Sequence, residues 1–422
     1  MYDSEGRRND ADVPVTGCGP ILSVSATPLR PLRQQIFETV RAAGRTARAD
    51  VTRSLGISPG SATTLSAELI AAGFLREVEG LPREAGRGRP PVALEVVPDA
   101  RLVVGIKLSD RAHTAVLTDF AGNVLANASQ PTQPHRKTLE QTVTEVAELV
   151  ATLLSGAQCD LSRISAVGAG LSGLVNHESG MVLWSPLLSQ RDLALGPALS
   201  RRFGLPVFLD NDANNLTLAE LWFGAGRARS DFAVVTIEEG VGMGLVLGNR
   251  LFRGSRGIGL ELGHTKVQLD GALCRCGKRG CLEAYVADYA LAREAATALD
   301  RNHNNPQSPK VMLETLFEQA KAGNESARTI FRRAGRYLSL GLANVVQLFD
   351  PELIILSGER MQYDYLYADE VIAEMRALTL EDGRVPCPVE IHAWGDLVWA
   401  RGASALALGA VTDQALGDGW VA

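Results

Sequence analysis

The stretch from Glu261 to Glu283 reads ELGHTKVQLDGALCRCGKRGCLE, and it decides how the rest of the chain is interpreted. It holds three of the six cysteines in a C-x-C-x4-C pattern, with a histidine ten residues upstream of the first. Structural Zn²⁺ sites are tetrahedral, and one His with three Cys is a common ligand set. The pattern therefore predicts one structural zinc ion per chain, held by His264, Cys274, Cys276 and Cys281.

The alternative to a metal site is a group of buried free thiols in an interior loop. Arg275, Lys278 and Arg279 alternate with the cysteines, which argues against burial, and their positive charge favours thiolate formation. Gly277 and Gly280 would let the backbone turn tightly enough for two cysteines to reach one ion. These features favour the metal site.

Two carboxylates flank the predicted ligands. Glu261 precedes the histidine by three residues, and Glu283 follows the last cysteine by two. A closed metal site can hold both carboxylates near one another without either binding the ion. Paired acceptors suit a polyhydroxylated ligand, because each hydroxyl needs a hydrogen-bond partner once it leaves water.

The runs ELGH at 261–264 and CRCGKRGCLEAY at 274–285 resemble the zinc signature of the ROK family, which comprises repressors, open reading frames and kinases. The resemblance extends from about Leu102 to Ala410. It implies that the His and the three Cys hold zinc, and that Glu261, His264 and Glu283 contact a sugar. It also implies an α/β, actin-like body of two lobes, as in sugar kinases. Two β-rich stretches, at 101–130 and 231–253, are each followed by helical patterns, which independently indicates a duplicated α/β body with a cleft.

Length and charge indicate how this body is extended. A chain of 422 residues predicts two or three domains. The net charge of −6 is divided unevenly: residues 1–28 carry −2, residues 29–98 carry +3 with ten Arg and no Lys, and residues 99–422 carry −7. A basic module attached to an acidic body indicates that only the module binds a polyanion.

The expected location is the cytoplasm. No run of 18 apolar residues occurs, so we expect no membrane span, and the polar N-terminus lacks the apolar segment of a signal peptide. The three cysteines outside the zinc pattern are scattered, which is consistent with a reducing compartment.

Residues 29–98 are expected to form a DNA-binding domain, preceded by a disordered tail at 1–28 and followed by the sugar-binding body at 99–422. Helices are predicted at about 32–43, from Thr46 as N-cap to Leu55, and from Pro59 onward with Ser58 as N-cap. Strands at 74–78 and 92–96 would form a hairpin with a basic, glycine-rich tip. The arrangement resembles the winged helix-turn-helix of ROK repressors.

The third helix and the hairpin tip would contact DNA. Small polar residues at the start of the helix would meet base edges, and arginines at the tip would reach phosphates or the minor groove. The predicted DNA-binding residues are Ser61, Thr63, Thr64, Arg87 and Arg89. A three-helix module that docks a protein is the alternative.

The phosphate-binding turns of ROK kinases are altered in this chain. The resemblance implies an Asp followed by Gly-Gly-Thr after the first strand of the body, where this chain has Lys107 and then Ser109-Asp110-Arg111. The family's Gly-Thr-Gly turn is Glu238-Glu239-Gly240, and its adenosine-side Gly-Gly is Ser357-Gly358. Carboxylates repel phosphate, and side chains hinder the close approach of backbone amides. We therefore expect no catalytic residues and no use of ATP.

The sugar-binding side keeps more of the family pattern. The run from Asn211 to Asn214 resembles the family's Asn-Asp-Ala-Asn, in which the Asp is the base of kinases and the Asn binds hydroxyls. Asn211 and Asp212 are therefore expected to bind sugar, while an N-cap of a helix at 213–224 is the structural alternative for Asp212. Ser185-Pro186-Leu187-Leu188 replaces a Ser-Pro-Asn-Leu common in relatives, which leaves the identity of the sugar open. Lys266, Arg253 and Trp184 are expected to be surface or core residues.

Together these patterns predict a sugar-responsive transcriptional regulator of the repressor type, which binds double-stranded operator DNA as a homodimer or homotetramer. One alternative is a ROK sugar kinase with an appended DNA-binding domain, against which Lys107 and Glu238 argue. Another is a regulator whose body serves only as a scaffold for dimerisation and protein docking, against which Asn211, Asp212 and Glu261 argue.

Overall fold

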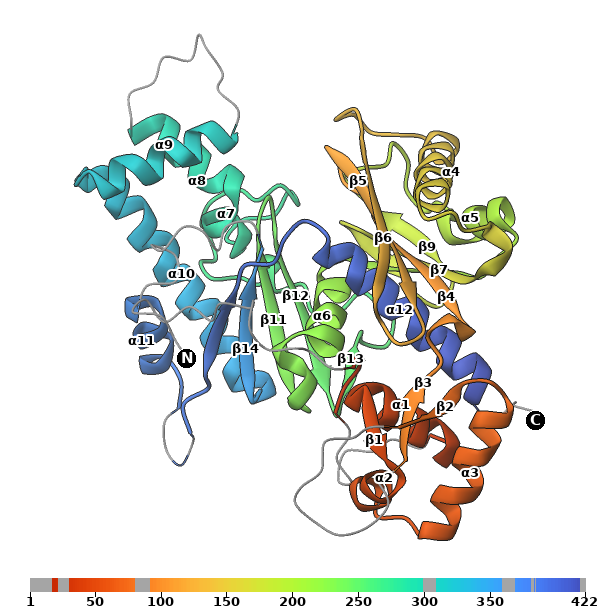
Figure 1. Cartoon of the computed structure of the whole chain (residues 1–422). Helices are drawn as coiled ribbons and strands as arrows, with labels where there is room; N and C mark the ends of the chain where they lie inside the picture. The colour runs from red at the N-terminus through yellow and green to blue at the C-terminus, as the bar shows by residue number, and fades with distance from the viewer. Residues whose placement is uncertain are drawn as a thin grey trace. The chain divides into compact units, whose positions relative to one another are not determined.

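The computed structural model describes residues 17–21, 30–79, 92–298, 309–358, 369–380, 383 and 385–417. The chain forms two compact units (Figure 1). The first contains residues 1–230, 246–258 and 395–422, and the second contains residues 231–245 and 259–394. None of the described helices is long and apolar enough to cross a bilayer.

The first unit begins with a small domain of three helices and a three-stranded sheet, drawn in red and orange in Figure 1. Its elements in chain order are α1 (Leu32–Ala43), β1 (Arg45–Ala47), α2 (Arg48–Leu55), α3 (Pro59–Ala71), β2 (Leu75–Val78) and β3 (Ala93–Val96). The sheet is antiparallel in the order β1-β3-β2. This is the element order of a winged helix-turn-helix, as predicted.

The ends of the helices in this domain follow local sequence signals, with one exception. The Ser58 hydroxyl accepts a hydrogen bond from the amide of Ser61 at 3.1 Å, and Gly56 ends α2 with φ of 63°, as expected for a helix-ending glycine. The prediction of an N-cap at Thr46 is wrong. Residues 45–47 pair with β3 instead, so α2 begins at Arg48.

Part of the predicted disordered tail is packed against the first unit. The Cys18 side chain is 2% exposed, its amide donates to the Arg41 carbonyl at 3.0 Å, and the Gly19 amide donates to the Trp222 carbonyl at 2.9 Å. Gly17 has φ of 83°, and a Cβ there would lie 2.3 Å from the Arg41 carbonyl oxygen, so only glycine fits. The expectation of disorder is therefore wrong for residues 17–21, and the other residues of 1–28 lie outside the described part of the chain.

The first lobe of the body is a five-stranded sheet in the order β10-β7-β4-β5-β6. Its strands are β4 (Leu102–Lys107), β5 (Ala112–Asp119), β6 (Val124–Pro131), β7 (Ile164–Leu171) and β10 (Val207–Asn211), and a small hairpin is formed by β8 (Leu174–Asn176) and β9 (Met181–Trp184). Strands β4 to β6 are antiparallel, whereas β7 and β10 run parallel to β4.

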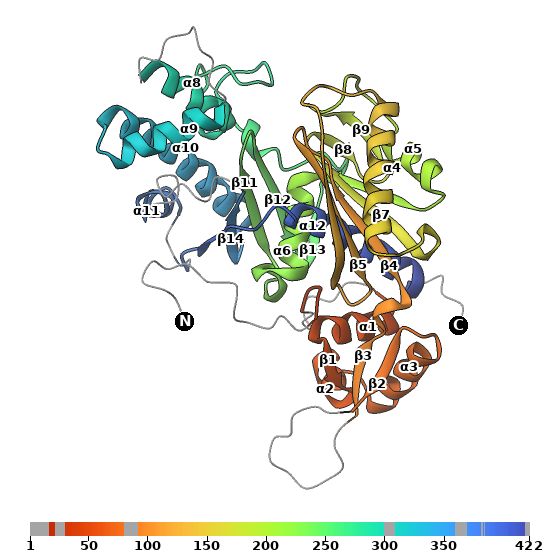
Figure 2. The same cartoon turned by 45° about the horizontal axis from the view of Figure 1, so that its top comes forward.

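Helices cover both faces of this sheet, as Figures 1 and 2 show. They are α4 (Leu139–Gly156), α5 (Leu195–Phe203), α6 (Asp212–Phe223) and α12 (Val398–Leu416). Leu102, Val104 and Ile106 of β4 pack in one core cluster with residues of α4 and α5. Because side chains alternate between faces along a strand, Gly105 points the other way and meets the α12 backbone.

A second five-stranded sheet of the body repeats this strand order. It runs β13-β12-β11-β14-β15 and is formed by β11 (Phe232–Ile237), β12 (Val241–Leu247), β13 (Arg250–Phe252), β14 (Leu353–Ser357) and β15 (Val389–His392). Strands β14 and β15 run parallel to β11, as β7 and β10 do to β4. The helices are α7 (Glu283–Val286), α8 (Asp288–Ala298), α9 (Pro309–Lys321), α10 (Glu325–Phe349) and α11 (Asp369–Ala377). The predicted duplicated α/β body is confirmed.

Candidate functional site

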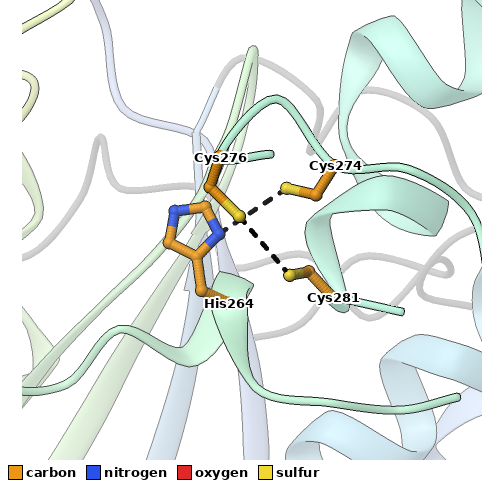
Figure 3. Close-up of side chains that lie close together, drawn as sticks. All are labelled: His264, Cys274, Cys276 and Cys281. Carbon is orange, nitrogen blue, oxygen red and sulfur yellow. Dashed lines mark hydrogen bonds between the residues drawn. The ribbon is translucent and has the colours of Figure 1, made fainter. Parts of the chain in front are cut away.

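The four predicted zinc ligands converge in the second unit (Figure 3). His264 Nδ1 lies 3.7 Å from Cys274 Sγ, and Cys276 Sγ lies 3.7 Å from Cys281 Sγ. All four ligand atoms lie within 4.8 Å of one another. Tetrahedral zinc with Zn–S of ~2.3 Å and Zn–N of ~2.0 Å requires ligand atoms about 3.5–3.8 Å apart. The cluster could therefore hold one metal ion.

The local backbone explains why these four side chains meet. His264 closes the 3₁₀ turn Leu262–His264, and the cysteines lie on a tight loop closed by isolated bridges between Leu273 and Arg279 and between Lys266 and Cys281. Gly280 has φ of 74°, and a Cβ there would lie 1.6 Å from the Gln268 carbonyl oxygen. The loop therefore requires glycine at this position, as the sequence predicted.

The cysteines differ in exposure. Only Cys276 is exposed, while Cys274 is 3% exposed and Cys281 is fully buried, so the argument from flanking charges against burial is wrong for two of the three. The charged residues of this loop, Arg275, Lys278 and Arg279, are all exposed. Burial raises the pKa of the Cys274 thiol to about 12, so a bound metal must displace its proton. Lys266, which was expected to be a surface or core residue, donates to Cys281 Sγ at 2.7 Å.

Two glutamates predicted to bind sugar lie beside the cluster. Glu261 Oε2 lies 4.0 Å from His264 Nε2, so the two imidazole nitrogens face different partners. Glu283 is 8% exposed, and its Oε1 lies 3.5 Å from Cys274 Sγ and 3.4 Å from the Tyr289 hydroxyl. Metal ligation by Nδ1 would leave Nε2 facing the Glu261 carboxylate. Tyr289 was missed because it lies outside the family motif.

Asn211 and Asp212 lie together in the first unit, at the start of α6. The N-cap role that was considered for Asp212 belongs to Asn211, whose Oδ1 accepts from the Ala213 amide at 2.8 Å. The Asn211 Nδ2 donates to the Gly173 carbonyl at 2.7 Å. The helix therefore begins at Asp212 and not at residue 213, which leaves the Asp212 side chain for other partners.

Asp212 forms an ion pair that the sequence did not predict. Its Oδ2 lies 3.3 Å from Lys107 Nζ and also accepts a hydrogen bond from the Ser172 hydroxyl. The Lys107 ammonium lies 4.0 Å from the centre of the Trp399 ring, which places it between an anion and an aromatic face. Lys107 had been noted only as a lost phosphate ligand, and neither Ser172 nor Trp399 lies near it in the sequence.

A second ion pair supports the loop before α6. Asp210 is 1% exposed and accepts from Arg253 Nε at 2.7 Å and from Asn214 Nδ2 at 2.7 Å. Because a buried carboxylate needs such partners, this pair fixes the strand end that carries Asn211. Arg253 is therefore a structural residue, in line with the prediction.

Side chains contact the turns at which the sequence predicted altered phosphate-binding sites. In the first unit, the Ser109 amide donates to His113 Nδ1 at 3.2 Å, and the Arg111 amide donates to the Ser109 hydroxyl at 3.3 Å. In the second unit, a Cβ placed on Gly358 would lie 3.1 Å from Glu238 Cγ. Backbone amides already paired with side chains are not free to receive a phosphate.

The predicted DNA-binding residues fall into two groups. Thr63 and Thr64 are exposed on α3, and Ser61 is half-buried with its hydroxyl 2.9 Å from that of Ser58. The Thr63 hydroxyl donates to the Pro59 carbonyl at 2.9 Å. Arg87 and Arg89 lie outside the described residues.

Comparison with known proteins places these features in a family. The model of the ROK family matches residues 103–410. The DNA-binding transcriptional dual regulator NagC of Escherichia coli K12 is 27% identical over 359 residues, which cover 84% of this chain and 86% of that protein. A glucokinase of Streptomyces coelicolor is 31% identical over 269 residues, covering 61% of this chain and 81% of the enzyme.

A solved structure extends the likeness to the whole fold. The crystal structure of a ROK family transcriptional regulator, a homologue of the E. coli MLC protein, superimposes with a TM-score of 0.74 at 28% identity. It covers 90% of this chain and 96% of the other. A match of that extent must include part of the winged domain, because the body after residue 98 is shorter than this.

Proposed function

The chain belongs to the ROK family, and we propose that it is a sugar-responsive transcriptional regulator of the repressor type. The observation that carries this proposal is the winged helix-turn-helix that precedes the ROK body in one compact unit with its first lobe. The similarity to a transcriptional regulator over 84% of the chain supports it, whereas the glucokinase match covers 61%.

The proposed DNA contacts are those of winged helix-turn-helix proteins. The start of α3, with Ser61, Thr63 and Thr64, enters the major groove, and Arg87 and Arg89 contact phosphates or the minor groove. Two-fold operators are read by pairs of such domains, so the active form in this proposal is a homodimer or homotetramer.

The proposed effector is a sugar or sugar derivative. The residues proposed to bind it are Asn211, Asp212, Glu261, His264 and Glu283. The metal proposed for His264, Cys274, Cys276 and Cys281 is Zn²⁺, which supplies a structural cross-link when bound. Both polar atoms of the Asn211 side chain already form hydrogen bonds to the backbone. In this proposal Asn211 therefore supports sugar binding mainly by fixing the start of α6.

Kinase activity is the alternative that the family makes possible, and three features count against it. Lys107 occupies one oxygen of Asp212, the carboxylate that matches the kinase base. Side chains take up the amides of the first phosphate turn, and Glu238 packs against Gly358. We therefore propose that the body binds sugar without phosphorylating it.

Two measurements test this function. Operator fragments selected from genomic DNA by the purified protein should bind tightly, and D-xylose, D-glucose or N-acetyl-D-glucosamine should change that affinity. A coupled assay with Mg-ATP over the same sugars should show no turnover. Sugar-dependent turnover that disappears in Asp212→Ala would establish the kinase alternative, and failure to select any DNA would remove the regulator.

A further inference from the structure

Helices α6 and α12 of the first unit run side by side from the Asp212 ion pair to the winged domain (Figures 1 and 2). A Cβ on Gly402 would lie 1.8 Å from the Asn215 carbonyl oxygen, and one on Gly409 would lie 3.7 Å from the Trp222 ring. The two contacts are seven residues apart on each helix and occur in the same order. The helices are therefore parallel and in close contact.

A cation joins the two helices where they begin. Lys107 Nζ lies 3.3 Å from Oδ2 of Asp212, the first residue of α6, and 4.0 Å from the ring centre of Trp399, in the first turn of α12. The Lys107 side chain is 13% exposed, so both interactions occur largely away from water.

A second cation joins the same helices near their ends. The Arg41 guanidinium of α1 lies 4.4 Å from the centre of the Trp222 ring of α6, and its Nη1 donates to the Thr412 hydroxyl of α12 at 2.9 Å. The Arg41 residue is 2% exposed, and its side chain also lies over Phe37 and Phe120. One buried side chain thus fixes the winged domain to both helices.

Helix α12 also packs closely on the sheet at two glycines. A Cβ on Gly105 of β4 would lie 2.1 Å from the Ala400 carbonyl oxygen, and one on Gly168 of β7 would lie 1.9 Å from that of Ala403. At these two positions the backbone of the sheet packs directly on the backbone of α12. Interiors packed in this way transmit displacement.

We propose that Lys107 and Arg41 are the two ends of a relay that transmits sugar occupancy at Asp212 along α6 and α12 to α1 of the winged domain. The inference rests on the proposed function. A sugar hydroxyl that bonds to Asp212 competes with Lys107 for the same carboxylate, so the ammonium and Trp399 shift. Arg41 then takes up the displacement of both helix ends. Coupling requires such a difference in contacts between the free and bound states.

The first test needs no sugar and uses amide hydrogen exchange of α1 in the full chain. Lys107→Met removes the ammonium, and Thr412→Val removes the acceptor of Arg41 at nearly constant volume. In a wild-type background Lys107→Met should speed α1 exchange by about threefold or more, whereas in Thr412→Val it should have no further effect. Independent changes at distant sites multiply to within about twofold.

An equal effect of Lys107→Met in both backgrounds, or no effect in the wild type, overturns the relay. Thr412→Ser is the matched control, because it keeps the acceptor oxygen and should preserve the response to Lys107→Met. If Thr412→Val does not fold, Arg41→Lys takes its place, since it keeps the charge but loses the guanidinium plane over Trp222.

The second test uses the sugar response itself. Operator affinity is measured with and without D-xylose, D-glucose and N-acetyl-D-glucosamine in wild type, Thr412→Val and Thr412→Ser. The ratio of the two affinities should fall to within about twofold of unity in Thr412→Val and stay at the wild-type value in Thr412→Ser. A full response in Thr412→Val contradicts the relay. If the wild-type protein responds to none of the sugars, the result contradicts the proposed function and not the relay. The relay is then decided by the amide hydrogen exchange measurements of the first test.

Discussion

At the scale of single residues, His264 joins the metal cluster to the proposed sugar site. Its Nδ1 faces Cys274 and its Nε2 faces Glu261, so loss of the metal should release both nitrogens at once. Mutation of residues that hydrogen-bond metal ligands typically lowers metal affinity or activity 10–100-fold. We therefore expect the ligand set to contribute to sugar binding as well as to folding.

The first prediction is that Cys281→Ser loses bound zinc and binds sugar about 10–100-fold more weakly. Cys281 is fully buried beside Cys276, so its loss opens the cluster and frees the loop that ends at Glu283. Metal analysis and calorimetry measure the two effects. Cys159→Ser, a half-buried thiol of the first unit, is the control and should change neither. Wild-type protein without metal would contradict the zinc assignment.

The second prediction concerns His113, which is buried beside the altered phosphate turn. Its Nδ1 accepts from the Ser109 amide, its Nε2 bonds Glu145, and burial lowers its pKa although the Glu145 contact opposes this. Nearby Lys137 also lowers the pKa. The unfolded chain therefore binds the proton more readily, so stability falls as pH drops below about 6.5.

Replacing the imidazole should remove this pH dependence. In the wild type, His113 takes up as much as one proton on unfolding between about pH 6.5 and 5. In His113→Gln the slope of unfolding free energy against pH should therefore be smaller in this range, by as much as about 1.4 kcal/mol per pH unit. Denaturant unfolding across this range measures it. Titration of Glu145 does not contribute to the slope in this range, because a carboxylate with a lowered pKa changes the unfolding free energy only at more acidic pH. Equal slopes in both proteins would show that His113 does not titrate on unfolding.

At the scale of elements, features that depend on residues close in sequence could be predicted. Features that depend on pairing between distant parts of the chain could not. The N-cap at Ser58 and the zinc ligand set were predicted because each depends on residues close in sequence. Strand β1 was missed because its partner β3 lies almost fifty residues away. For the same reason the Lys107–Trp399 contact could not be predicted, since nothing in either local sequence specifies the other.

The third prediction concerns the hairpin between β2 and β3. Replacing both Arg87 and Arg89 with Ala should weaken operator binding and reduce the slope of log affinity against log salt by about one to two, because each phosphate contact releases about one counterion. Titrations at several salt concentrations measure this. Arg201→Ala/Arg202→Ala, two exposed arginines of α5, is the matched control and should leave the slope unchanged. An unchanged slope in the hairpin variant would mean that this segment does not touch DNA.

At the scale of the whole molecule, the winged domain and the first lobe behave as one unit. The segment Val97-Pro98-Asp99 between them is itself packed, since the Val97 amide donates to the Phe74 carbonyl and the Phe120 amide donates to the Pro98 carbonyl, both at 2.9 Å. Phe37 and Phe120 stack with ring centres 4.8 Å apart across the junction. Because this segment is packed, we expect a change in the first lobe to reach the winged domain.

The last prediction is that Asp212→Ala abolishes the sugar response, so that its operator affinities with and without sugar agree within about threefold, well under 1 kcal/mol. Asp212 is the proposed sugar contact in the unit that carries the winged domain, and its removal deletes the group for which sugar and Lys107 compete. Dimeric helix-turn-helix proteins need their recognition helices about 34–36 Å apart, so a small displacement of α1 is enough to alter the affinity for operator DNA. Linkage also requires that a sugar which weakens DNA binding be bound more weakly by the DNA complex, by the same factor, with typical couplings of about 1–3 kcal/mol.

Operator titrations with and without sugar, for the wild type and for Asp212→Ala, measure the operator affinities and their dependence on sugar. Thr217→Ser, a conservative change within α6, is the control and should keep the full response. An Asp212→Ala protein that still responds fully would place the effector site away from α6.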